Sequence, residues 1–160
     1  MLEWLTNTPY AEWVRESWGW PIALTIHAFG TATVVGFIFI IGLRLLGLFR
    51  TIPYTSLSSF FPVIWIAIAF QFVSGFTLWM SKPAQYLSAG MFDVKFSLVI
   101  VGVVVTAFFQ GTIKREAAAW EKAGTVSSRG IKFVAAAVLV WTAVNIAGRL
   151  TAYLTSLYIA

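Results

Sequence analysis

The 160-residue chain contains no cysteine, only one histidine and few charged residues. Without cysteine it can form no disulfide, no thiolate metal site and no cysteine nucleophile. Charged residues make up 11% of the sequence, against about 25% in a typical soluble domain. Any imidazole chemistry or nitrogen ligation by histidine therefore rests on His27 alone.

Apolar residues are abundant instead. Hydrophobic residues account for 59% of the chain and aromatic residues for 17%, and the mean hydropathy is +0.84. These values indicate an integral membrane protein, and the length suits a single domain over residues 1–160. The net charge of +5 does not indicate nucleic-acid binding, because the basic residues flank apolar runs instead of forming a stripe with interleaved aromatics.

Four apolar runs are each long enough to cross a bilayer, which takes roughly 20 apolar residues. They lie near residues 21–48, 60–80, 94–112 and 131–158. The runs lack the alternation of membrane β-strands, so the predicted fold class is an all-α, four-transmembrane-helix bundle. Pro21 and Pro62 stand in the first turns of their helices, where a missing N–H costs little. Pro53 and Pro83 are expected in connections.

Residues 1–20, before the first run, mix tryptophans with charged side chains. Thr8 and Pro9 resemble a helix start, with Thr8 as the cap and Pro9 at the first helical position. Tryptophan prefers the head-group level of a bilayer. The segment is therefore expected to form an amphipathic interfacial helix. The alternative is a short surface helix packed on the bundle, and the two are compatible.

Basic residues predict the topology. Four spans put the connections after the first and third spans on one side, with Arg44, Arg50, Lys114, Arg115, Lys122, Arg129 and Lys132. The other side has Arg15, Lys82, Lys95 and Arg149. The positive-inside rule makes the first side cytoplasmic. We therefore expect a multi-pass protein of a bacterial inner membrane, with both termini in the periplasm.

Three cationic or potentially cationic residues are predicted at similar depth in the outer leaflet. His27 lies about two helical turns inside the first span, Lys95 opens the third, and Arg149 lies two or three turns from the end of the fourth. Polar residues inside membrane helices are expensive, so they are functional candidates by default. Together they could hold a haem propionate, a quinone carbonyl or a lipid phosphate.

The fourth span adds a polar stripe. Trp141, Asn145, Arg149 and Tyr153 are each four residues apart and share one helical face. Such a stripe is expected to face the bundle interior. We count these four, with His27 and Lys95, as candidate ligand-binding residues, and His27 as a metal ligand only if haem is bound.

Each candidate also has a purely structural interpretation. His27 could hydrogen-bond a neighbouring helix, Arg149 could pair with Asp93 or extend to the interface, and Lys95 could be an interfacial anchor. The stripe around Trp141 could serve packing alone. No Walker loop, dinucleotide fingerprint or Ser-His-Asp arrangement is present in the sequence.

Several short segments, in order and spacing, resemble the landmarks of a bacterial family of small four-helix membrane proteins of unknown function. They are Val14–Trp18, Pro21, His27–Gly30, Leu43–Gly47, Ser74–Gly75, Phe92–Lys95 and Gly148–Tyr153. The resemblance implies a four-span fold in which His27, Arg44, Lys95 and Arg149 occupy characteristic polar positions. It implies no activity.

Two departures from the family pattern matter. Gly42 stands where relatives often have Asp, and Gln110 stands where a second histidine is common. The second departure weakens any haem site built on two histidines of one chain.

The function expected from these residues is a non-catalytic integral membrane subunit in a homo-oligomer or a larger redox or energy-transducing complex. It would contact the lipid bilayer, carry bound lipid and have a polar ligand site in the outer leaflet. The alternative is a haem b- or quinone-binding electron-transfer protein that uses His27. A small-molecule transporter is less supported, because the spans lack a mid-membrane acid and an inverted repeat.

Overall fold

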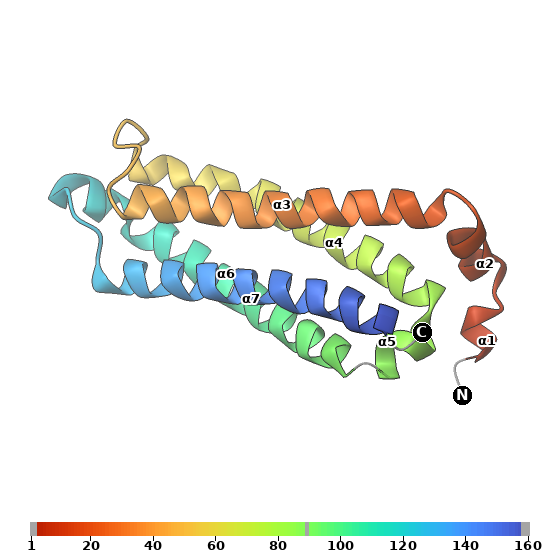
Figure 1. Cartoon of the computed structure of the whole chain (residues 1–160). Helices are drawn as coiled ribbons and strands as arrows, with labels where there is room; N and C mark the ends of the chain where they lie inside the picture. Colours follow the sequence, from red (N-terminus) through yellow and green to blue (C-terminus); the bar gives the residue numbers. More distant parts are fainter. Residues whose placement is uncertain (1–2, 89, 158–160) are drawn as a thin grey trace.

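The computed structural model describes residues 3–88 and 90–157, and every regular element in these residues is helical. Four long helices form the bundle, with α4 and α6 inclined to α3 and α7 (Figure 1). They are α3 (Gly19–Leu45), α4 (Phe61–Ser81), α6 (Met91–Ala123) and α7 (Ser128–Leu157). Each contributes a segment long and apolar enough to cross a membrane. The predicted all-α, four-span bundle is confirmed. The predicted boundaries at Met1, Tyr158 and Ala160 lie outside the described residues.

The bundle has two distinct ends. At the terminal end lie α1 (Glu3–Thr6), α2 (Pro9–Glu16) and α5 (Pro83–Ser88), together with the end of α7 (Figure 1). At the loop end lie the connections 46–53 and 124–127. The 3-10 helix η1 (Tyr54–Phe60) leads from the first connection into α4. Pro83 lies in the connection between α4 and α6, as expected, and begins the short helix α5 there.

Helix α2 begins as the sequence predicts and packs across the terminal end of the bundle. The Thr8 hydroxyl accepts a hydrogen bond from the Ala11 N–H at 3.2 Å, and Pro9 occupies the first helical position. The Tyr10 hydroxyl lies 2.8 Å from Thr77 Oγ1 on α4. Arg15 donates to the carbonyl of Ser81, the last residue of α4. These contacts hold α2 against the bundle. The segment therefore contains a short surface helix packed on the bundle, the alternative given for residues 1–20 in the sequence.

Helix α6 continues about three turns beyond its predicted apolar run, which ended near residue 112. The hydropathy falls where Lys114, Arg115 and Glu116 begin. The helix nevertheless continues, because the alanines and long charged side chains that follow are strong helix formers. It ends where Gly124 adopts a left-handed conformation, with φ of +66°, and donates its N–H to the Trp120 carbonyl.

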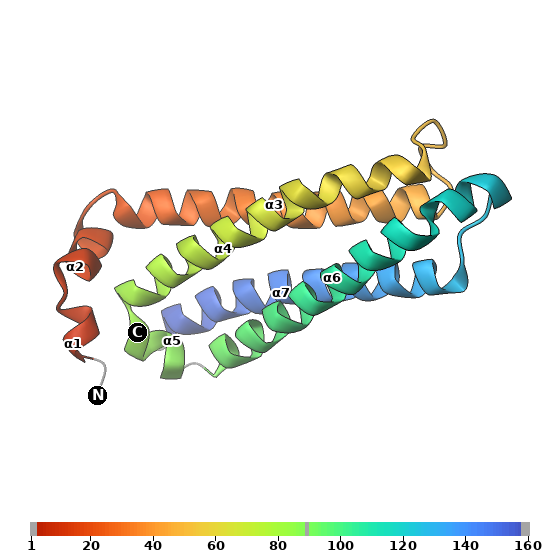
Figure 2. The same ribbon diagram turned by 180° about the vertical axis from the view of Figure 1, so that it is seen from behind.

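The four long helices form two pairs, α3 with α4 and α6 with α7, joined by contacts between α3 and α7. Close approach of α3 to α4 depends on Gly30, where an added Cβ would lie 2.9 Å from Gln71 Cγ and 3.2 Å from the Ala67 carbonyl oxygen. Figure 2 shows α4 and α6 diverging from the loop end toward the terminal end. The two halves of the bundle are therefore packed differently.

The loop half holds the dense core. Its fully buried side chains include Ile38, Ile41, Leu57, Phe61 and Phe109. The rings of Phe61 on α4 and Phe109 on α6 meet edge to face, with centroids 5.8 Å apart. This geometry is the preferred one for aromatic pairs and adds to the stabilisation from burial.

A buried arginine ties the loop end together. The Arg44 guanidinium lies 3.7 Å above the centre of the Tyr54 ring, and its Nε donates to the Ile52 carbonyl at 2.5 Å. The Tyr54 N–H in turn donates to Glu121 Oε2 at 2.5 Å. Arg44 therefore joins α3 to η1, and Glu121 joins η1 to α6. Arg44, one of the polar positions that the family resemblance implies, therefore has a structural role.

Candidate functional site

A cavity of about 290 Å³ lies in the half of the bundle toward the terminal end, where α4 and α6 have diverged. All four long helices contribute to its lining. The lining residues are His27 from α3; Ile68, Gln71, Phe72, Gly75, Phe76 and Trp79 from α4; Phe92, Lys95, Phe96 and Val99 from α6; and Trp141 from α7. The lining is mostly apolar with a few convergent polar groups, which is typical of small-molecule sites.

The His27 ring is held by a hydrogen-bond chain. Its Nδ1 lies 3.0 Å from Ser74 Oγ, and the Ser74 hydroxyl donates to the Phe70 carbonyl at 2.6 Å. A hydroxyl has one proton, and the 2.6 Å contact with the Phe70 carbonyl, the shortest that Ser74 Oγ makes, assigns that proton to Phe70. Ser74 then accepts from Nδ1–H. A neutral imidazole then has its lone pair on Nε2, and no described residue donates a hydrogen bond to it.

Gly75 allows the imidazole to approach α4 this closely. A Cβ at Gly75 would lie 3.1 Å from His27 Cε1 and 3.5 Å from Nδ1, and Nε2 is farther away. A side chain at this position would therefore require the ring to shift by a few tenths of an ångström. In the sequence, Gly75 stands out only as part of the Ser74–Gly75 segment of the family resemblance, without its partner.

Lys95 is the second polar group of the cavity. Its Nζ lies 3.5 Å from the position that a Cβ on Gly148 would take, so the amine lies against α7 at a residue without a side chain. It is near enough to His27 for an electrostatic interaction. No hydrogen bond or ion pair engages the ammonium group among the described residues, which leaves its three donors available to a ligand.

Aromatic rings form most of the remaining wall. Trp79 lies between Phe76 and Phe92, with centroids 5.8 Å and 6.5 Å away, and Phe92 stacks on Phe96 at 6.4 Å. Tyr86 of α5 adjoins this row, 6.0 Å from Phe92, and burial raises the pKa of its phenol. The row presents flat apolar surfaces that suit a planar ligand.

Trp79 carries an unsatisfied donor. Its Nε1–H is buried and has no acceptor, the only such side-chain atom found in the described part of the chain. A buried donor without a partner costs about 1–3 kcal/mol. Trp79 does not stand out in the sequence, because eight tryptophans are present and most are expected at the interfaces.

The cavity opens on the surface that a bilayer would cover. Phe72, Phe76 and Phe96 line it and are nevertheless 46%, 58% and 50% exposed. A ring that both lines a cavity and faces outward marks its edge. A ligand dissolved in the bilayer could therefore enter sideways between α4 and α6.

The predicted stripe on α7 does not stay on one face. Trp141 is buried and lines the cavity, with its Nε1–H donating to Thr106 Oγ1 at 3.0 Å. Asn145 donates to the Trp141 carbonyl of its own helix, and Tyr153 is 63% exposed. Four residues overshoot a full helical turn by about 40°. Repeated steps of four therefore move the stripe from the interior to the outside.

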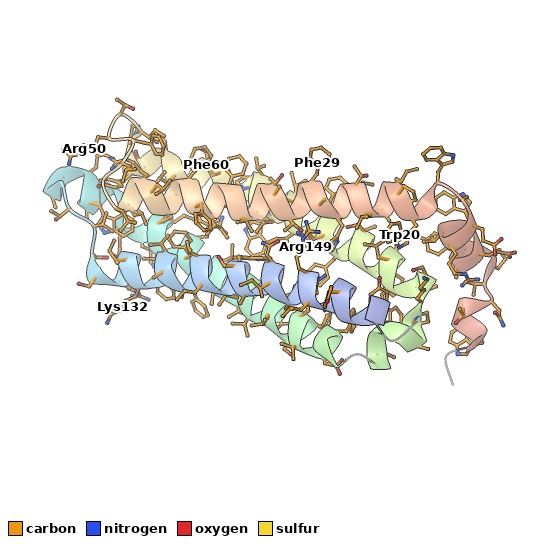
Figure 3. All side chains as sticks on the ribbon, in the orientation of Figure 1. Trp20, Phe29, Arg50, Phe60, Lys132 and Arg149 are labelled. Atoms are coloured by element: carbon orange, nitrogen blue, oxygen red, sulfur yellow. The ribbon has the colours of Figure 1, made fainter. Side chains whose placement is uncertain are left out.

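Of the three cationic candidates, the structure brings two into one cavity. His27 and Lys95 line it, whereas Arg149, Asn145 and Tyr153 do not. Figure 3 shows Arg149 on the side of α7 that faces α3, and its side chain is exposed. Gly148, the residue before Arg149, is the one against which Lys95 packs.

Gln110 lies outside the cavity lining. Its Oε1 accepts a hydrogen bond from Trp65 Nε1 at 2.9 Å and so joins α6 to α4. No cluster of three or more His, Cys, Asp or Glu residues suited to a metal ion occurs in the described ranges.

The chain was compared with protein-family models, with curated proteins and with solved structures. No family model, curated protein or solved structure matches it.

Proposed function

We propose that this protein is an integral membrane subunit that binds the ring of a lipid-soluble quinone in the cavity between α4 and α6. The observation that carries the proposal is the pairing of His27 Nε2, an available acceptor, with the Lys95 ammonium, an available donor, in a cavity walled by aromatic rings. A quinone ring is flat, apolar on both faces and polar at two opposite oxygens. The aromatic rings of the lining match its two faces, and the Lys95 ammonium can donate to one of its oxygens.

The route of entry supports a ligand from the bilayer. The exposed edges of Phe72, Phe76 and Phe96 line the opening, and no charged residue stands among them. A water-soluble ligand would need a polar entrance. A quinone partitions into lipid and would meet this opening directly.

The size of the cavity favours a quinone ring over haem b. Ligand pockets commonly measure about 300–1,000 Å³, and 290 Å³ lies just below that range. A ring system of one or two six-membered rings suits this space better than a four-pyrrole macrocycle.

Haem b remains the second candidate for one specific reason. A histidine whose Nδ1–H is held by an acceptor and whose Nε2 is available is the usual arrangement of an axial ligand. An absorption spectrum of the protein purified from its native membrane, oxidised and then reduced, decides between the two. A Soret band that disappears in His27→Ala would establish haem.

The proposed role is that of a binding subunit in a homo-oligomer or a larger redox complex. The cavity lining offers one imidazole and one amine, without a carboxylate or thiol to complete a catalytic set. We further propose an inner-membrane location with the terminal end outward. Arg50 and Lys132 lie together at the loop end (Figure 3), which would make that end cytoplasmic by the positive-inside rule.

Quinone binding can be tested with the protein in lipid nanodiscs. A short-tailed benzoquinone is titrated while tryptophan fluorescence is recorded, since Trp79 and Trp141 line the cavity. Lys95→Met should weaken binding about tenfold or more, because a hydrogen bond to a charged group contributes about 1.5–3 kcal/mol. Lys132→Met removes an exposed lysine at the loop end and serves as the matched control.

The contribution of the aromatic wall of the cavity to binding can be tested with the same titration. Phe76→Ala should weaken binding, whereas Phe29→Ala should not, since Phe29 points away from the bundle in Figure 3 and is 71% exposed. Saturable quenching that is equal in all four variants would place the ligand elsewhere. Absence of saturable quenching in the wild-type protein would refute the proposal.

A further inference from the structure

We infer that the cavity prefers a ligand that donates a hydroxyl proton to His27, and therefore binds the reduced quinol more tightly than the oxidised quinone. This inference rests on the proposed function and adds to it a selectivity for one redox state. It follows from the fixed direction of the hydrogen-bond chain behind the imidazole.

The direction of the chain is set by the main chain of α4. The Phe70 carbonyl can only accept, so it takes the Ser74 proton at 2.6 Å. Ser74 Oγ must then accept from His27 Nδ1–H at 3.0 Å. The neutral imidazole is left with Nε2 as an acceptor, and Nε2 can pair only with a donor.

The two redox forms meet this acceptor differently. Both oxygens of a quinone only accept hydrogen bonds, so Lys95 can serve one of them but His27 Nε2 is left unpaired. A quinol has a hydroxyl at each end. One hydroxyl can donate to Nε2 while the opposite oxygen accepts from Lys95. A site built to hydrogen-bond a hydroxyl rejects the analogue that lacks it, because the buried polar group of the site then has no partner.

Protonation of His27 does not easily remove the difference in affinity between the quinol and the quinone. An imidazolium could donate from Nε2 to a quinone carbonyl, but it would place a second positive charge beside Lys95 within a membrane helix. Charges at that depth are costly. The neutral ring and its preference for a donor are therefore favoured.

The inference is tested by titrating nanodisc-embedded protein anaerobically with a short-tailed benzoquinol and, separately, with the matching benzoquinone. We expect the dissociation constant of the quinol to be about tenfold lower, equivalent to about 1.4 kcal/mol. The same ratio would raise the midpoint potential of the bound two-electron couple by about 30 mV relative to the free couple. Redox titration of the bound ligand gives this second, independent value.

Two variants separate the role of His27 as the hydrogen-bond acceptor from the role of Ser74 in fixing the His27 tautomer. His27→Phe removes the acceptor and should bring the ratio of the two constants close to one. Ser74→Ala leaves the imidazole in place but removes the acceptor that fixes its tautomer, so the ratio should also fall. This makes Ser74 a positioning residue. Lys132→Met should retain the wild-type ratio.

The possible failures are distinguishable. Equal binding of both forms by the wild-type protein, or tighter binding of the quinone, would overturn the inference and leave the proposed function standing. Binding of neither form would overturn both. A wild-type preference that survives unchanged in Ser74→Ala and His27→Phe would show that His27 does not produce it. If His27→Phe does not fold, the wild-type ratio and Ser74→Ala decide the question.

Discussion

Replacing Gly75 by alanine tests the contact that brings His27 against α4. The added Cβ would lie 3.1 Å from His27 Cε1 and 3.5 Å from Nδ1. Carbon atoms at optimal separation are about 3.5–4.0 Å apart, so the ring must move by a few tenths of an ångström. This movement lengthens the 3.0 Å hydrogen bond to Ser74 and shifts the acceptor that faces the cavity.

A matched control exists on the neighbouring helix. Gly36 in α3 has no atom within 4 Å of the position of an added Cβ. Gly36→Ala should therefore stabilise the protein by about 0.5–1 kcal/mol, because alanine loses less backbone entropy in a helix than glycine. Gly75→Ala gains the same amount but meets a crowding cost of about 1–3 kcal/mol. Its net effect should range from neutral to about 2.5 kcal/mol destabilising.

The assay compares both variants with the wild-type protein in the same nanodiscs. Thermal unfolding gives the stability difference, and titration with the benzoquinol, the form that can donate to His27, gives the affinity difference. Gly75→Ala should weaken binding about threefold to tenfold, corresponding to loss of one hydrogen bond worth about 0.5–1.5 kcal/mol, and Gly36→Ala should leave binding unchanged. If Gly75→Ala is stabilised like Gly36→Ala and binds with full affinity, the imidazole position is not controlled by this glycine.

Three further predictions concern stability. Trp79→Phe should destabilise the protein less than Trp141→Phe in thermal unfolding, by about 1 kcal/mol or more, because the first removes a buried donor without a partner and the second breaks a hydrogen bond to α6. Equal losses would contradict this difference in hydrogen bonding. Arg44→Lys should lose about 1–2 kcal/mol, since an ammonium cannot reproduce a planar group stacked 3.7 Å from the Tyr54 ring; an unchanged melting temperature would show that the stacking is dispensable. Tyr10→Phe should loosen α2 on α4 and speed limited proteolysis of the first twenty residues, and an unchanged cleavage rate would show that the remaining contacts, including Arg15 with Ser81, suffice to hold α2.

The long helices could be predicted from the sequence because hydropathy and length alone identify membrane spans. The depth of His27 and Lys95 also followed from their distance to the helix starts, and both residues line the cavity. Depth requires only the rise per residue. It is therefore readable from one sequence.

The rotation of each helix about its axis was not readable. The spans are apolar on every side, so no polar face indicates which residues point inward. This is why Trp79 was missed. Asn145 and Tyr153 were expected inside because residues four apart were assigned to one face, although each such step turns about 40° too far. The partner of His27 was also beyond the sequence, since Ser74 and Gly75 meet it only through the crossing of α3 and α4.

The outward-facing rings of Phe72, Phe76 and Phe96 have a consequence for how affinity must be expressed. A site that fills from the bilayer responds to the mole fraction of ligand in the lipid, not to its concentration in water. Adding empty lipid at fixed protein and ligand should therefore empty the site, although nothing in the aqueous phase has changed. For such a protein, the composition of the surrounding membrane sets the occupancy.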